Sequence, residues 1–390
     1  MKLSRRINNL APSATLAMTS RARTMKAEGR DVLSLTVGEP DFSTPDYIGE
    51  AAKKAIDEHF TRYTAEPGIV ELRDAVCGYF KSSYGVTAKS ENIIMTNGGK
   101  QGLYNLFLCL LDPGDEVLIP APFWVSYPAM VELADGKPVV VSAPAEAGFK
   151  VTPEQLEKHR TPKTRCLVLN SPSNPSGACY TKAEADALAK WALDNKVVLL
   201  ADEIYDQLVY APAEQVTFSS WWEKYPENFA ICGGVSKTYA MTGWRVGHVL
   251  CATELAKAMT RLQGQTTSNV CSIAQKAALA AYNGGLDAVA EMRKAFQRRR
   301  DLAYEVISSW KDVYCPLPGG AFYIFPDMHG LYTAAIPNSM SLCEQLLEKA
   351  GVALVPGGPF GDDNCVRISY AVSDAMLAEA LDRIGKFLYK

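Results

Sequence analysis

One lysine stands among small, hydroxylic and apolar residues in the segment GGVSKTYAMTGWRVG, residues 233–247. The segments NFAICGG before it and RVGHVLCA after it each read as a buried strand, so Lys237 follows the end of a strand. Lysine is rarely buried, and a place on a surface loop is the ordinary alternative. A lysine held among apolar neighbours loses its proton more easily, however, and can then act as a nucleophile or a base. We therefore regard Lys237 as a candidate catalytic residue.

An anion site is predicted where TNGGKQGLYNLF passes from a strand into a helix through Gly98 and Gly99. The first N–H groups of a helix and the positive end of its dipole bind phosphate without particular side chains. A glycine-containing turn of purely structural role is the alternative. The fingerprints G-x-G-x-x-G and G-x-x-x-x-G-K-[ST] are both absent from the sequence, which disfavours a nucleotide phosphate loop.

Further polar groups follow two other predicted strands. LLADEIYDQLVY places Asp202 and Glu203 at a strand end with Tyr205 just beyond, and SPSNPSG holds Asn174 between two prolines. Helix capping by the acids and ordinary turn chemistry are the alternatives. Because ligands of open α/β sheets bind at the carboxyl ends of the strands, we expect these groups to converge with Lys237 on one site.

The elements that must position these groups alternate along the chain. Thr181 with Glu184 has capping-box spacing, and Thr152-Pro153 opens another helix. The alternation of strands and helices predicts an α/β fold whose mostly parallel sheet is covered by helices on both faces. The predicted strands lie in the runs NIIMTNGG, DEVLIPAP, KPVVVSAP, TRCLVLN, KVVLLADE, NFAICGG and RVGHVLCA.

A second, smaller unit is predicted toward the C-terminus. It combines GGAFYIFPDM, GVALVPGGPFG and CVRISYAV with helices, which is an α+β arrangement. We therefore predict a large domain over residues 45–292 and a small domain made of residues 1–44 and 293–390. The arginine cluster RKAFQRRRD at 293–301 is expected on a solvated helix face.

Composition argues against several classes of function. With a net charge of −3 over 390 residues, the chain offers no electrostatic case for binding nucleic acid or a membrane. No segment approaches the ~18 apolar residues of a membrane span, and the N-terminus lacks the apolar stretch of a signal peptide. The ten cysteines include no C-x-x-C pair, and no metal site is predicted. Cysteines inside apolar runs fit a reducing compartment, for which the cytoplasm is the default.

The predicted site would bring an amine, an acid, a phenol, an amide and a phosphate cradle to one edge of the sheet. Pyridoxal 5'-phosphate uses all five of these groups. It needs a lysine for the Schiff base, an acid at its ring nitrogen, donors to its phenolic oxygen and an anion site for its phosphate. The residue types therefore indicate a pyridoxal-phosphate enzyme.

The chain resembles the class I aminotransferases of fold type I, and within them the bacterial aspartate aminotransferase subgroup. This resemblance implies the fold type I architecture, a large domain plus a smaller α+β domain. It also implies ping-pong transfer of an amino group between L-aspartate and 2-oxoglutarate, giving oxaloacetate and L-glutamate. It covers nearly the whole chain through the motifs PSATLAM, VGEPDFSTP, RYTAEPGIVELR, GGKQGL, WVSYP, NPSG, DEIY, SKTYAMTGWRVG, GGAFY and RISYA.

The resemblance also implies roles around the cofactor ring. Lys237 matches the covalent anchor and general base, and Asp202 matches the partner of the pyridine nitrogen. Tyr205 and Asn174 would donate hydrogen bonds to the phenolic oxygen. Trp124 would stack on the ring and border the substrate.

Further matches concern the phosphate and the substrate. Those expected at the phosphate are Gly99, the backbone of Lys100, Ser236, Arg245 and the partner subunit's Tyr63, which implies a homodimer with shared active sites. Arg367 in CVRISYA would bind the substrate's α-carboxylate beside Asn174, with Gly38 nearby, because a planar guanidinium pairs bidentately with a carboxylate. The side chain of Lys100 would meet the distal carboxylate of a dicarboxylic substrate, and a solvated surface position is its alternative.

Three functions stay open: transamination of dicarboxylic amino acids, another pyridoxal reaction, or a non-enzymatic sensor that borrows the fold. The second includes aromatic or prephenate transamination and β-elimination by a β-lyase. A sensor usually needs an attached DNA-binding module, and we expect about forty residues before the core motifs to leave no room for one. Family members that take prephenate often carry a basic residue before PSAT, where this chain has Ala11. Aspartate is therefore favoured over prephenate.

Overall fold

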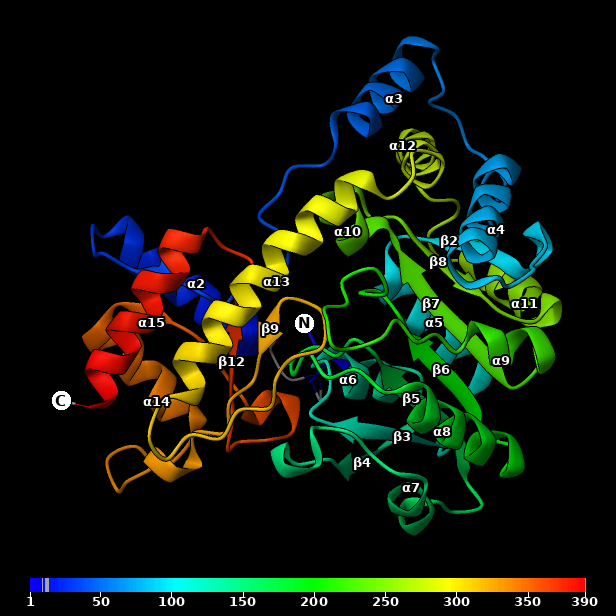
Figure 1. Cartoon of the computed structure of the whole chain (residues 1–390). Helices are drawn as coiled ribbons and strands as arrows, with labels where there is room; N and C mark the ends of the chain where they lie inside the picture. The colour runs from blue at the N-terminus through cyan, green and yellow to red at the C-terminus, as the bar shows by residue number, and fades with distance from the viewer. Residues whose placement is uncertain (9, 11–13, 390) are drawn as a thin grey trace.

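A computed structural model describes residues 1–8, 10 and 14–389, which form a larger and a smaller unit (Figure 1). The larger unit is built on a seven-stranded sheet in the order β2-β8-β7-β6-β5-β3-β4. Within the described residues β8 alone runs against the other strands of this sheet, so the predicted mostly parallel sheet is confirmed. The strands coincide with the seven predicted runs and are β2 (Ile93–Thr96), β3 (Glu116–Ala121), β4 (Lys137–Ser142), β5 (Thr164–Asn170), β6 (Val198–Asp202), β7 (Phe229–Gly234) and β8 (Gly247–Leu250).

Helices cover both faces of this sheet. Successive residues of a strand point to opposite faces, so the apolar strands need a helical layer on each side. Ile94 packs in a core with α5, α6 and α11, whereas Ile93 packs in a second core with α4, α7, α8, α9 and α12. Thr152 and Thr181 cap α7 and α8 in capping boxes, as predicted. The helices of this unit are α3 (Asp46–Asp57), α4 (Val70–Tyr84), α5 (Gly99–Leu110), α6 (Ser126–Leu133), α7 (Pro153–His159), α8 (Lys182–Asp194), α9 (Ser219–Lys224), α10 (Val235–Thr238), α11 (Thr253–Gly264) and α12 (Ser272–Asn283).

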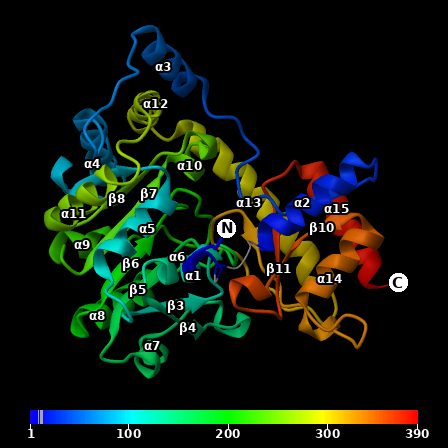
Figure 2. The same cartoon turned by 180° about the vertical axis from the view of Figure 1, so that it is seen from behind.

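The smaller unit joins the two ends of the chain (Figure 2). β1 (Leu33–Ser34) pairs in parallel with β10 (Val352–Ala353), and a three-stranded antiparallel sheet has the order β11-β12-β9. Strands and helices share one core, which is the predicted α+β arrangement. Its remaining elements are α2 (Ala14–Ala27), β9 (Tyr323–Ile324), α14 (Ser339–Gln345), a π-helical turn (Leu346–Ala350), β11 (Val355–Pro356), β12 (Val366–Ser369) and α15 (Asp374–Leu388). The shorter helices of the chain are α1 (Arg5–Asn8), Ser90–Asn92, Ala145–Ala147, Thr242–Trp244, His329–Leu331 and Gly358–Phe360.

One continuous helix, α13 (Asp287–Ser308), passes from the larger unit to the smaller (Figure 1). Its Val289 packs in the core of the larger unit, whereas Phe296 and Ile307 pack in the core of the smaller one. The predicted domain boundary between residues 292 and 293 therefore falls inside this helix. The position of the boundary stays a prediction.

The arginine cluster at 293–301 is not wholly on a solvated face, so this expectation was wrong for two of its members. Arg299 and Arg300 are buried. Arg299 pairs with Asp41 at 2.8 Å and with Asp374 at 2.7 Å, and Arg300 donates to two backbone carbonyl oxygens. The physical reason is that α13 lies against other segments of the chain on this side, where hydrogen-bonded carboxylates and carbonyls compensate the buried charges.

Candidate active site

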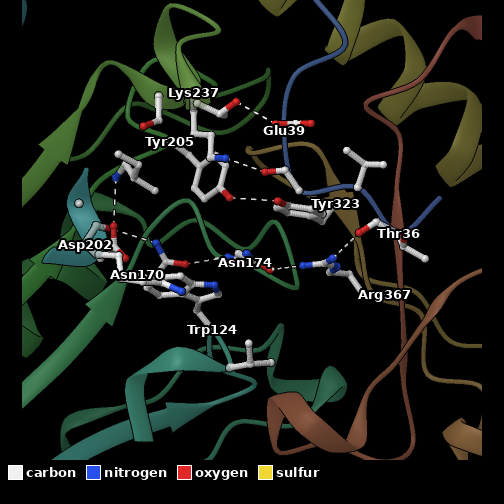
Figure 3. A pocket seen from close by; sticks show the side chains of 18 of the residues that line it. Thr36, Glu39, Trp124, Asn170, Asn174, Asp202, Tyr205, Lys237, Tyr323 and Arg367 are labelled. Carbon is white, nitrogen blue, oxygen red and sulfur yellow. Dashed lines mark hydrogen bonds between the residues drawn. The ribbon is translucent and has the colours of Figure 1, made fainter. Parts of the chain in front are cut away.

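A cavity of about 630 Å³ lies between the strand ends of the larger unit and the smaller unit (Figure 3). Tyr63 is the one predicted site residue that does not line it, and its side chain is 90% exposed. The sheet edge therefore gathers the side chains as its topology predicts. The predicted residues that line the cavity are Gly38, Gly99, Lys100, Trp124, Asn174, Asp202, Tyr205, Ser236, Lys237, Arg245 and Arg367.

Lys237 lies in α10, directly after β7, as its sequence context predicts. Its Nζ donates a hydrogen bond to the backbone oxygen of Gly38 at 2.6 Å and lies 5.9 Å from the ring centroid of Phe322. Burial lowers the pKa of Lys237 to about 8, although the nearby charge of Glu39 opposes this effect. An amine that loses its proton this close to neutral pH can serve as a nucleophile or a general base.

Asp202 ends β6 and is buried at the floor of the cavity. Its Oδ2 accepts a hydrogen bond from the phenol of Tyr127 at 2.5 Å, and its Oδ1 accepts one from the backbone N–H of Ile204 at 3.3 Å. Burial raises the pKa of Asp202 to about 6, while these hydrogen bonds and the charge of Lys237 act in the opposite direction. A cationic group in the cavity would stabilise the ionised carboxylate further.

Glu203, the neighbouring acid, serves a different part of the molecule. Its carboxyl accepts hydrogen bonds from Thr217 Oγ1 and from the backbone N–H of Phe218, both at 2.7 Å. It does not line the cavity, and burial raises the pKa of Glu203 to about 8. The geometry thus separates two acids that the sequence places side by side.

Tyr205 and Asn174 lie on the wall between Asp202 and the smaller unit (Figure 3). The hydroxyl of Tyr205 is 3.1 Å from that of Tyr323, and burial holds the pKa of Tyr205 well above its usual range. The phenol therefore stays protonated and can donate a hydrogen bond. Asn170 links the two strand ends, because it accepts from the backbone N–H of Asn174 at 2.7 Å and donates to the backbone oxygen of Asp202 at 2.9 Å.

Arg367 on β12 is a buried cation with no acidic partner among the described residues. It donates to Oδ1 of Asn174 at 3.0 Å and to the backbone oxygen of Thr36 at 2.8 Å, and its ring neighbour Tyr323 lies 4.6 Å from the guanidinium carbon. Among the described residues, no group forms a hydrogen bond with the Nε of Arg367. A buried guanidinium without an acidic partner fits an anionic ligand such as a carboxylate.

The predicted anion site lies at the start of α5. Gly98 has φ +79°, and a Cβ at this position would come within 2.7 Å of Arg245 Nη2, so glycine keeps this space open. Arg245 donates to the backbone oxygens of Thr242 and Asn97 at 3.0 and 3.3 Å. Free N–H groups of the first helical turn, a guanidinium and the Ser236 hydroxyl together suit a phosphate.

Trp124 and Lys100 line the cavity from the larger unit. The indole packs edge to face against Tyr127, with ring centroids 5.4 Å apart, and Lys100 Nζ lies 4.8 Å from the Trp124 ring centroid. Burial and the charge of Arg245 lower the pKa of Lys100. Lys100 is an exposed residue that also lines the cavity, so its binding role stays a prediction beside the alternative of a solvated surface position.

Sequence reasoning missed several lining or supporting residues. Tyr127 stands three positions after Trp124 in the motif WVSYP, so helical spacing could have pointed to it. Tyr323 lies in the motif GGAFY, but nothing local shows that it faces Tyr205. Ala11, on which the expectation about prephenate depends, lies outside the described residues.

Two kinds of feature are absent from the described part of the chain. None of its helices is both long and apolar enough to cross a membrane. Its histidine, cysteine and acidic side chains do not gather in any group that could hold a metal ion.

Comparisons with known proteins agree on one family. A family model described as "Aminotransferase class I and II" matches residues 30–384. An aspartate/prephenate aminotransferase of Cereibacter sphaeroides is 47% identical over 392 residues, covering 99% of this chain and 98% of that protein. An aspartate aminotransferase of Bacillus subtilis is 42% identical over 391 residues, and the match covers 100% of this chain and 100% of that protein. The structure of the aspartate aminotransferase from Thermus thermophilus with maleate has a TM-score of 0.94 at 41% identity, covering 99% of both chains.

Proposed function

The chain belongs to the class I and II aminotransferase family, and from this we propose that it transfers an amino group between L-aspartate and 2-oxoglutarate, giving oxaloacetate and L-glutamate. The observation that carries the proposal is the meeting of three side chains in one cavity: the desolvated amine of Lys237, the buried carboxyl of Asp202 and the buried guanidinium of Arg367, which has no acidic partner among the described residues. Each has a separate use in the reaction.

The family uses pyridoxal 5'-phosphate, and the cavity fits this cofactor. The start of α5, where Arg245 lines the cavity, suits its phosphate, and Asp202 suits its ring nitrogen. Gly99, Lys100 through its backbone, and Ser236 would complete the phosphate site. When bound, the cofactor supplies a protonated ring that withdraws electrons from the substrate's Cα.

Lys237 would anchor the cofactor covalently and, once the incoming amino acid displaces it, remove the proton from the substrate's Cα. A pKa near 8 suits both roles, because a useful share of the amine is unprotonated at neutral pH. Asp202 would keep the ring nitrogen protonated through a charge-assisted hydrogen bond. Tyr205 and Asn174 would donate to the phenolic oxygen, and Trp124 would stack on the ring.

Two cations would orient a dicarboxylic substrate. Arg367 is held by Asn174 and Thr36 and has no acidic partner among the described residues, so it would bind the α-carboxylate, with Gly38 beside it. Lys100 would bind the distal carboxylate from the larger unit. The partial burial that lowers the pKa of Lys100 also strengthens its attraction to a carboxylate.

We also propose a homodimer in which the partner subunit's Tyr63 binds the cofactor phosphate. α3 lies at the outer end of the larger unit, away from the smaller unit (Figure 1). Tyr63 does not line the cavity described above. Exposed large apolar side chains are groups that a contact with another chain would cover. The exposed large apolar side chains of this segment are Phe42, Tyr47, Ile56, Tyr63 and Val70.

The cytoplasm is the compartment that we propose for the enzyme. All ten cysteines are free thiols, and Cys166, Cys232 and Cys251 are among those that are buried. Free thiols persist in a reducing compartment. Fractionation of the source cells tests this, and recovery of the enzyme from an oxidising compartment would contradict it.

Absorbance spectra of the purified holoenzyme test the proposed reaction. We expect aspartate to change the cofactor band stoichiometrically, oxaloacetate to be released, and 2-oxoglutarate to restore the original band with formation of glutamate. Sedimentation at several protein concentrations tests the dimer. A cofactor band that aspartate leaves unchanged would contradict the proposal, and release of ammonia and pyruvate from β-substituted amino acids would favour a β-lyase instead.

Prephenate is the second candidate acceptor, because the Cereibacter sphaeroides relative is named an aspartate/prephenate aminotransferase. The same assay with prephenate in place of 2-oxoglutarate decides between the two acceptors. Since Ala11 replaces the basic residue expected for prephenate, we expect 2-oxoglutarate to react with the higher kcat/KM.

A further inference from the structure

The charge of the cavity exceeds what the proposed roles use. Lys237, Arg245, Arg367 and Lys100 each have a proposed partner in the cofactor or the substrate. Arg23 has none. Among the described residues, the charged side chains that line the cavity are the cations Arg23, Lys100, Lys237, Arg245 and Arg367 and the acids Glu39 and Asp202.

Arg23 reaches the cavity from the smaller unit. It lies on α2 four residues after Thr19, and both residues line the cavity, as two side chains one helical turn apart can do. The hydroxyl of Thr19 is 2.9 Å from that of Thr36, whose backbone oxygen accepts from Arg367 at 2.8 Å. Arg23 on α2 and Arg367 on β12 thus both come from the smaller unit, whose elements α2 and β12 Figure 1 labels, whereas Lys100 comes from α5 of the larger unit.

The guanidinium of Arg23 is exposed and makes no hydrogen bond or ion pair with any other residue that the structure describes. Arg21, two positions earlier on the same helix, instead pairs with Glu344 at 3.4 Å and with Glu348 at 2.7 Å. The helix therefore carries one arginine that is neutralised within the protein and one that is left for a ligand. A guanidinium offers N–H groups in a fork that matches the two oxygens of a carboxylate.

We propose that Arg23 binds the distal carboxylate of the dicarboxylic substrate, opposite Lys100. This proposal rests on the proposed function. Lys100 is a single ammonium beside the Trp124 ring, so it meets one carboxylate oxygen well and leaves the other to a second donor. Arg23 is that donor, and the distal carboxylate then joins the two sides of the cavity.

Binding of glutarate and pentanoate to the holoenzyme, measured by calorimetry near physiological salt, tests the proposal. Both ligands have five carbons and one carboxylate for Arg367, but only glutarate has a second carboxylate. We expect Arg23→Ala to weaken glutarate binding by about 5- to 10-fold and to leave pentanoate binding unchanged. Arg23→Lys should fall between the wild type and Arg23→Ala, because it keeps the charge without the fork.

Arg21→Ala is the matched control, since it removes the same charge from the same helix without reaching the cavity. We expect it to bind both ligands as the wild type does. Glutarate affinity unchanged in Arg23→Ala would overturn the proposal, and so would equal weakening of glutarate and pentanoate. A wild-type enzyme that neither binds glutarate nor converts aspartate would instead contradict the proposed function, so the two failures are distinguishable.

Discussion

Tyr127 donates its phenolic hydrogen to Oδ2 of Asp202 at 2.5 Å, and both side chains are buried. This contact favours the ionised carboxylate and opposes the burial that raises the pKa of Asp202. We therefore propose that Tyr127 is a positioning residue, which would act on the cofactor through Asp202.

Replacing Tyr127 by phenylalanine should raise the pKa of Asp202, because a donor to its charged form is lost. The acidic limb of the kcat/KM profile for aspartate should then move to higher pH by about one unit or more, since a hydrogen bond to a charged group contributes roughly 1.5 kcal/mol or more. Measurement of kcat/KM between pH 5 and 9 checks this. Tyr180→Phe, which removes a buried hydroxyl that accepts from Val151, is the control and should leave the limb in place.

Local patterns predicted much of this fold. Each strand of the main sheet is a short apolar run, and the boxes at Thr152 and Thr181 depend on residues three positions apart. Such local patterns could not predict contacts between residues that lie far apart in the sequence. Tyr127 and Asp202 are 75 residues apart, and neither segment alone shows that they meet.

The resemblance to a family predicted which residues surround the cavity, but not how each is held. The unpartnered Nε of Arg367 depends on how β12 packs against the N-terminal segment. The place of Arg23 depends on the side of α2 that faces the cavity. Both follow from packing between distant segments, which hydrophobic periodicity does not encode.

Asp202→Asn should separate activity from stability. The amide cannot hold the ring nitrogen protonated, so we expect turnover to fall at least 100-fold while cofactor occupancy falls much less. Folding raises the pKa of Asp202 from 3.8 to about 6, so the ionised carboxyl opposes folding above about pH 6 and has no such effect below about pH 4. The cofactor-free variant should therefore be more stable than the cofactor-free wild type at pH 8, by about 1 to 3 kcal/mol.

Steady-state kinetics and urea unfolding at pH 4 and pH 8 measure these two effects. Glu203→Gln is the matched control, because Glu203 is an equally buried acid that does not line the cavity. We expect it to keep near-normal turnover. Normal turnover in Asp202→Asn together with loss in Glu203→Gln would mean that the roles of the two acids are reversed.

Lys237→Ala should give a folded protein that binds the cofactor without a covalent bond and has almost no transaminase activity. The cofactor should then be removable by dialysis, and its absorbance should match that of the free compound. Absorbance spectra before and after dialysis, together with an aspartate assay, measure both effects. A cofactor band that survives dialysis in this variant together with normal turnover would contradict the covalent role of Lys237.

Lys100→Ser should distinguish a substrate role for this side chain from a cofactor role. If Lys100 binds the distal carboxylate, kcat/KM for aspartate and glutamate should fall by about 10- to 100-fold, which corresponds to ~1.4 to 2.7 kcal/mol for a partly desolvated charge pair. Phenylalanine and tyrosine carry no second carboxylate, so their kcat/KM should be unchanged or should rise. Lys190→Ser, which removes an exposed lysine paired with Asp194, is the control and should leave all four donors unaffected. Equal losses for acidic and aromatic donors would tie Lys100 to cofactor binding, and the distal carboxylate would then depend on another cation of the cavity.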